Sequence, residues 1–181
     1  MKKKYLISCI GVLILMSHRV GVAGNLPGSV TITLADAYYH FNNKRDLNNS
    51  AFPNLALAYN FTQHWAMEAG AGILNTRQSE ELGGEGVHGV LYNIDGIYRF
   101  GAFGHLEPYV LGGIGLLTLA PNGTDSEHPG NINAGLGAQL FWGPTVAMRA
   151  EFRDVYQTTG NSYNDYMLNF GVSFLFGGDK T

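Results

Sequence analysis

Residues 146–153 read VAMRAEFR, and their alternation decides the fold. The even-numbered residues of this stretch are apolar, whereas Arg149, Glu151 and Arg153 occupy odd-numbered positions. Successive side chains of a β-strand point to opposite faces, so the stretch predicts a strand with one apolar face and one charged face. We expect these faces to meet different surroundings, hydrocarbon on one side and a polar space on the other.

Similar alternation recurs along the chain between stretches rich in Asn, Gly and Ser. We expect eight strands, at residues 30–41, 55–61, 65–75, 87–100, 106–119, 131–141, 145–156 and 166–176. Their connections alternate between long ones, at 42–54, 76–86, 120–130 and 157–165, and short ones, at 62–64, 101–105 and 142–144. This plan predicts an all-β, eight-stranded antiparallel up-and-down transmembrane β-barrel with short periplasmic turns and four long extracellular loops.

The N-terminus has the pattern of a secretory signal peptide. Lys2, Lys3 and Lys4 precede an apolar run that ends at Met16, which is shorter than the ~20 residues that a membrane-spanning helix needs. We expect cleavage near Ala23, so that residues 1–23 are removed and residues 24–181 form the barrel domain. The single cysteine excludes a disulfide framework, and the net charge of −3 excludes a basic nucleic-acid-binding surface.

Aromatic residues gather near the ends of the expected strands and predict two girdles at the membrane interfaces. The lower girdle comprises Tyr59, Phe61, Trp65, Tyr98, Phe100, Phe141 and Trp142, and the upper girdle comprises Tyr38, Tyr39, Phe41, Tyr156 and Tyr166. A soluble lipocalin-like periplasmic carrier is an alternative, because its apolar faces would turn inward around a ligand.

Two strands fit the alternation of a barrel strand less well. Asp36 has the parity of Leu34, so we expect a β-bulge near Ala35 to turn it inward, and the strand at 106–119 is apolar on both faces.

The polar faces predict a charged interior, because eight strands leave a lumen just wide enough for side chains. The acids expected there are Asp36, Glu68, Asp95 and Glu151, and the bases are Arg99, Arg149 and Arg153. Buried charges persist only when they are paired, so we expect a salt-bridge network in which Glu68 pairs with Arg149. A narrow gated ion path, in which the pairs exchange partners, is the alternative. Neither a His-Glu-x-x-His nor a Gly-x-Ser-x-Gly motif occurs, and we expect no enzymatic activity, cofactor or metal.

Several stretches resemble the OmpA-type outer-membrane proteins, in the branch that includes OprF. Residues 59–68 (YNFTQHWAME) resemble the second hairpin of that family with its lumenal Glu, residues 108–115 (PYVLGGIG) its fifth strand, residues 147–153 (AMRAEFR) its seventh strand, and residues 164–166 (NDY) the entry to its last strand. The resemblance implies a barrel in the outer membrane of a Gram-negative bacterium. The family usually continues into a peptidoglycan-binding domain. Because the sequence ends at Thr181, we expect that tethering role to be absent.

The last strand carries a second signal. Asn169, Gly171, Phe174 and Phe176 fit the pattern polar-x-Gly-x-x-aromatic-x-aromatic that the barrel-assembly machinery recognises. We therefore expect a monomeric barrel, inserted by that machinery, with a structural role and with surface interactions through its loops. The expected partners are outer-membrane lipids and lipopolysaccharide, with host or phage surface ligands at the loops and no nucleic acid. A narrow porin or a channel for ions and small solutes stays open as an alternative.

Overall fold

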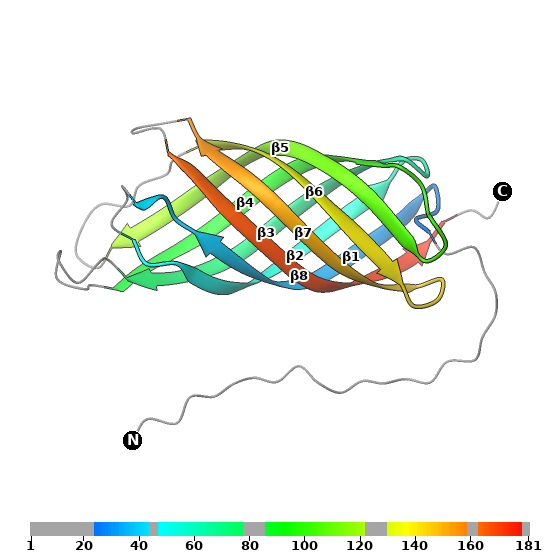
Figure 1. Ribbon diagram of the computed structural model, residues 1–181, viewed down its shortest axis with the longest axis horizontal. Helices are drawn as coiled ribbons and strands as arrows, with labels where there is room; N and C mark the ends of the chain where they lie inside the picture. Colours follow the sequence, from blue (N-terminus) through cyan, green and yellow to red (C-terminus); the bar gives the residue numbers. More distant parts are fainter. Residues whose placement is uncertain (1–23, 44–46, 78–85, 122–129, 159–162, 179–181) are drawn as a thin grey trace, which may run out of the picture.

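Eight strands form one closed antiparallel barrel in sequence order (Figure 1). The computed structural model describes residues 24–43, 47–77, 86–121, 130–158 and 163–178. The strands are β1 (Ser29–His40), β2 (Ser50–Asn60), β3 (Trp65–Arg77), β4 (Gly86–Arg99), β5 (Leu106–Pro121), β6 (Gly130–Phe141), β7 (Val146–Gln157) and β8 (Asn164–Gly177). The predicted fold is confirmed. The predicted signal peptide lies outside the described residues and stays a prediction.

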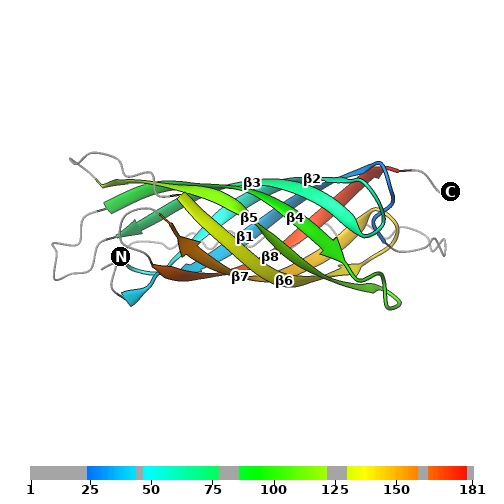
Figure 2. The ribbon, with the colours of Figure 1, turned by 90° about the horizontal axis from the view of Figure 1, so that it is seen from above.

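The wall closes where β1 pairs with β8, from Ser29 opposite Gly177 to His40 opposite Tyr166. Following the paired residues once round the barrel from Val30 leads back to β1 at His40, a stagger of 40 − 30 = 10 residues. A stagger of this kind requires the strands to tilt by about 35–45° from the barrel axis. Figures 1 and 2 show this tilt around a long, narrow cylinder.

The two ends of the cylinder differ. The short turns at residues 61–64, 100–105 and 142–145 lie at one end, together with Gly24 and Gly178, and we call it the turn end (Figure 1). The strand ends that flank the four longer connections lie at the opposite end, which we call the loop end. Among the described residues, no helix is long and apolar enough to cross a membrane.

Each strand turns one row of apolar side chains away from the lumen. Leu55, Ile94, Ile114, Leu136 and Phe170 are each more than half exposed, although all five lie in mid-strand. A soluble carrier would turn these rows inward, so that alternative is wrong. The outer aromatic rings include Tyr38, Tyr59, Phe61, Trp65, Phe100, Trp142, Tyr156 and Tyr166, as expected for the girdles. Tyr39, Phe41 and Phe141 were wrongly assigned to them, because these three side chains are buried inside the barrel.

Asp36 does not reach the lumen, which corrects the sequence analysis. No bulge interrupts β1, because its pairing with both β2 and β8 runs unbroken past Ala35. Asp36 therefore lies exposed on the outer face, with the parity of Leu34. The neighbouring inward residues explain the register, since Ala37 and Tyr39 are packed in an apolar cluster inside the barrel. A bulge would move both of these side chains out of that cluster.

β2 begins at Ser50, five residues before the predicted start at Leu55. Phe52 extends the strand, because its ring is buried in the lumen beside Gly72. Pro53 points outward and has no N–H to donate. The ladder between β2 and β3 accordingly ends at Asn54 opposite Gly72, although both strands continue beyond it.

Inward glycines let the wall close tightly, and Gly171 provides a test. A Cβ at Gly171 would lie 2.4 Å from the carbonyl oxygen of Leu34 and 2.6 Å from Cβ of Ala35. We expect Gly171→Ala to lower the free energy of unfolding by about 1–3 kcal/mol, because neighbouring backbone must move. Urea unfolding of the barrel in lipid vesicles, followed by tryptophan fluorescence, measures the change.

Gly112→Ala is the matched control for this prediction. Gly112 faces outward, and the nearest atom to a Cβ there would be the carbonyl oxygen of Asn133, at 3.6 Å. Alanine at this position is therefore expected to leave stability unchanged or to raise it slightly, since glycine is entropically unfavourable in strands. Equal destabilisation by the two substitutions would contradict the packing argument.

Candidate functional site: the barrel lumen

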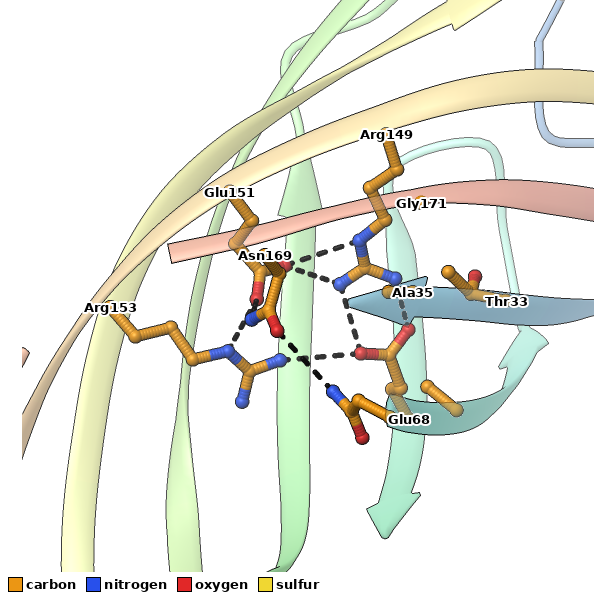
Figure 3. A pocket seen from close by; sticks show the side chains of 10 residues that line it. Thr33, Ala35, Glu68, Arg149, Glu151, Arg153, Asn169 and Gly171 are labelled. Atoms are coloured by element: carbon orange, nitrogen blue, oxygen red, sulfur yellow. Dashed lines mark hydrogen bonds and ion pairs between the residues drawn. The ribbon is translucent and has the colours of Figure 1, made fainter. Parts of the chain in front are cut away.

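Charged side chains from three strands meet in the middle of the lumen (Figure 3). Arg149 on β7 binds Glu68 on β3 with both terminal nitrogens, and the bond from Nη2 to Oε1 is 2.9 Å long. The same guanidinium also pairs with Glu151, two residues further along β7. The Glu68–Arg149 pair expected from the sequence is thus present, and Arg149 lies between two carboxylates.

Arg153 extends this cluster toward the loop end. It pairs with Asp95 on β4 and with Glu151, and its Nη2 is 3.4 Å from Oε1 of Glu68. All five ionic side chains of the cluster are buried. Three carboxylates therefore face two guanidiniums, and we call this set of Glu68, Asp95, Arg149, Glu151 and Arg153 the central network.

Neutral groups complete the hydrogen bonds of the central network. The Tyr109 hydroxyl donates to Oε2 of Glu151 and accepts from Nε of Arg149, at 2.7 Å in both bonds. Asn133 donates to Asp95 at 2.9 Å, and Asn169 donates to Glu151 at 3.0 Å. Sequence reasoning missed the role of Tyr109, because the strand at 106–119 is apolar on both faces and its sidedness could not be assigned.

An apolar cluster packs in the loop half of the lumen, and the buried side chains of Gln157 and Asp165 lie beside it, where Asp165 accepts hydrogen bonds from the Tyr39 hydroxyl and from the Gln157 amide, both at 3.2 Å. Ten buried side chains pack together there, namely Ala37, Tyr39, Phe41, Phe52, Leu74, Val87, Leu91, Leu117, Val155 and Met167. The sequence analysis expected a charged interior and did not foresee this apolar cluster. The signal was present in β3, β4 and β5, where Leu74, Leu91 and Leu117 sit on the faces that point inward.

The turn half of the lumen combines an ion pair with two small apolar clusters, one of Ala66, Ile97, Tyr109 and Leu111 and one of Phe141, Ala147 and Leu175. Nε of Arg99 lies 3.6 Å from Oε2 of Glu107, and both side chains are buried. Arg99 was expected among the lumenal charges at a level below Arg149, and the structure places it there, in a separate layer with Glu107, an acid that the sequence analysis did not single out. Asn25 and Gln139 lie beside Glu107, and the two amide side chains are joined by a 2.7 Å hydrogen bond.

Among the described residues, the lumen is packed around the central network. Residues of the central network line a cavity of about 10 Å³, together with Thr33, Ala35, Asn54 and Gly171 (Figure 3). That volume is at the lower limit for one water molecule. Of the four residues in the predicted assembly signal, Asn169 and Gly171 face this cavity, whereas Phe174 and Phe176 are exposed on the outer face.

The comparison with protein families identifies this architecture. A family model described as the OprF membrane domain matches residues 1–180. The chain belongs to the OprF membrane-domain family. Outer membrane porin F of Pseudomonas aeruginosa is 26% identical over 160 residues, which are 84% of this chain and 46% of that protein. The chain thus spans about half the length of the curated relative that it matches.

Solved structures show the same fold. The N-terminal β-barrel domain of Pseudomonas aeruginosa OprF aligns with a TM-score of 0.65 at 20% identity, covering 84% of this chain and 100% of that domain. Neisserial surface protein A aligns with a TM-score of 0.69 at 14% identity, covering 82% and 99%. The protein is therefore an outer-membrane β-barrel of the Gram-negative envelope, with its turn end toward the periplasm and its loop end toward the exterior.

The charge count of the central network predicts an asymmetry between its members. Arg149→Met leaves one oxygen of Glu151 without a cation and leaves Glu68 with only the 3.4 Å contact to Arg153, so we expect the free energy of unfolding to fall by about 3–5 kcal/mol. Glu68→Gln removes the surplus negative charge, and each guanidinium keeps a carboxylate. We expect this variant to lose only about 1.5 kcal/mol. Urea unfolding in vesicles at neutral pH compares the two, and an equal loss would contradict the asymmetry.

Proposed function

We propose that this protein is a closed, non-enzymatic barrel whose role is structural and whose surface interactions are made by the four connections at its loop end. The observation that supports the proposal is the packed lumen. An apolar cluster packs in the loop half of the lumen, a hydrogen-bonded ionic layer packs in the middle, and the cavity between the network residues is about 10 Å³. A rigid barrel of this kind is a suitable base for interacting connections, since binding residues are disproportionately found on loops held by rigid scaffolds.

In this proposal the central network is a structural plug. Each guanidinium in it contacts at least two carboxylates, and those carboxylates accept further bonds from Tyr109, Asn133 and Asn169. Such full pairing is what allows charges to persist away from water. Because its members come from β3, β4 and β7, the network ties opposite parts of the wall together.

In this proposal the protein is synthesised as a precursor that is exported to the periplasm. Residues 1–23 act as a signal peptide that is removed in the periplasm, and the barrel-assembly machinery then recognises Asn169, Gly171, Phe174 and Phe176 on β8. The mature barrel is a monomer that contacts lipids and lipopolysaccharide along its apolar faces. Host or phage surface molecules are the partners proposed for the loop end.

A narrow pore is the second candidate, and the name of the curated relative favours it, since that protein is called a porin. Conduction would require the ionic pairs to exchange partners and the apolar layer around Tyr39 and Phe52 to part. The packing of both layers weighs against this in the resting barrel.

Conductance separates the two candidates. We expect the purified barrel in planar bilayers to show no channel steps, because three packed layers fill its lumen. The double variant Tyr39→Ala/Phe52→Ala opens the apolar layer, and the triple variant that adds Arg149→Ala is expected to conduct. Regular channel steps from the wild-type protein would refute the closed barrel and favour the pore.

The assembly signal is tested by Phe176→Ala. We expect insertion by reconstituted barrel-assembly machinery to slow several-fold, whereas unassisted refolding into detergent is unchanged. Phe170→Ala is the matched control, since Phe170 lies on the same outer face of β8 and is 60% exposed, against 55% for Phe176, but has no place in the pattern. Equal slowing by both substitutions would show that outer apolar area, rather than the signal, governs insertion.

A further inference from the structure

The segment that precedes β1 enters the turn end of the barrel. Asn25 is only 2% exposed, although it lies before the first strand. Its Nδ2 donates to Glu107 on β5 and to Gln139 on β6, and its Oδ1 accepts from Thr31 on β1 at 3.2 Å. One amide side chain therefore joins three strands across the mouth, and all three of its polar partners are themselves buried.

The backbone around Asn25 is held as firmly as its side chain. Gly28 donates to the carbonyl oxygen of Asn60 at 2.7 Å, and the Ser29 hydroxyl donates to the carbonyl of Leu26 at 2.6 Å. The Asn60 amide in turn donates to Ser29 and Thr31. These hydrogen bonds fix the backbone of residues 25–28, and they therefore fix the position of Gly24.

Gly24 arrives beside the carboxylate of Glu107. A Cβ on Gly24 would lie 3.7 Å from Oε1 of Glu107, while Asn25 and Arg99 both approach the other oxygen, Oε2. Arg99 does not saturate this carboxylate, because its Nε lies 3.6 Å away, and neither Nε nor Nη1 has a hydrogen-bond partner among the described residues. Oε1 of Glu107 therefore lies close to the backbone of Gly24, and the backbone N–H of Asn25 also donates to this carboxylate.

We propose that the turn-end mouth is a binding site for the mature N-terminus of this chain, in which Glu107 binds the α-ammonium group of Gly24. The inference rests on the proposed removal of residues 1–23. Leader peptidase hydrolyses the Ala23–Gly24 amide with one water, so the acyl carbon of Ala23 becomes a carboxylate. The nitrogen of Gly24 becomes a free amine, which is mostly protonated at neutral pH.

Cleavage changes what the mouth can bind. In the precursor the nitrogen of Gly24 is an uncharged amide with one N–H, whereas in the mature chain it is a cation with three donors. A charge-assisted hydrogen bond to a buried carboxylate is about twice as strong as a neutral one. The mouth is therefore fully occupied only after processing, with Asn25 and the new terminus seated side by side on Glu107.

Amine reactivity tests the site on the mature protein purified from outer membranes. Intact mass first establishes the N-terminal residue, which we expect to be Gly24. Acylation of the α-amine by an activated ester is then followed by peptide mass spectrometry, in the folded barrel and in urea. We expect the folded barrel to react about tenfold more slowly than the unfolded chain, because the amine is held by a charged acceptor.

Glu107→Gln is expected to remove most of that protection, and Glu107→Asp, which keeps the charge but shortens the side chain, to give an intermediate rate. Asp154→Asn is the charge-matched control, since Asp154 lies on the outer face of β7, and it is expected to react as wild type does. Tryptophan fluorescence checks that each variant folds. Equal protection in wild type, Glu107→Gln and Glu107→Asp overturns the proposal, as does a mature terminus other than Gly24. Channel activity would refute the closed barrel without altering these rates.

Discussion

The pairing of β1 with β8 is the constraint on which the rest of the structure depends. Hydrocarbon offers no water to an unpaired backbone group, so strands can cross a membrane only when each has a neighbour on both sides. Closure supplies those neighbours, from Ser29 opposite Gly177 to His40 opposite Tyr166. It also divides all side chains into two sets, because the period of two sends alternate residues into the lumen or toward lipid.

The content of the lumen follows from that division. Whatever alternates with the lipid-facing rows is forced inside, including the central network, Arg99, Glu107 and Asp165, whose charges would be costly if they were alone. Arg149 and Arg153 each lie against more than one carboxylate, so none of the guanidinium charge is isolated. The apolar cluster around Tyr39 and Phe52 covers the loop side of these ions, and the layer of Asn25, Arg99 and Glu107 covers the turn side. Among the described residues, these two layers thus flank the ions on both sides within the barrel.

Sequence reasoning predicted the features that alternation alone determines. The strand containing Arg149 and Glu151 has one charged and one apolar face. The pairing of Arg149 with Glu68 could be anticipated because buried charges need partners of opposite sign. Residues whose placement depends on packing were missed. Asp36 was expected inside because a carboxylate is unfavourable in lipid, but the burial of Ala37 and Tyr39 fixes the register that places it outside. Glu107 and Tyr109 lie on a strand without a polar face, so only coordinates reveal that they point inward.

The stagger of ten residues has a consequence for how such a chain can change over generations. Because ten is an even number, lipid-facing residues lie beside lipid-facing residues, and lumen-facing beside lumen-facing, where β1 pairs with β8. Deleting one residue within a strand would move every later side chain of that strand to the opposite face. The register with both flanking strands would then be shifted by one residue. Deletions or insertions of two residues keep lumen-facing and lipid-facing residues on their own faces. Changes of any length in the connections at the loop end leave the faces of the strands unaltered. Length variation among descendants is thus confined to outer connections and, within the wall, to pairs.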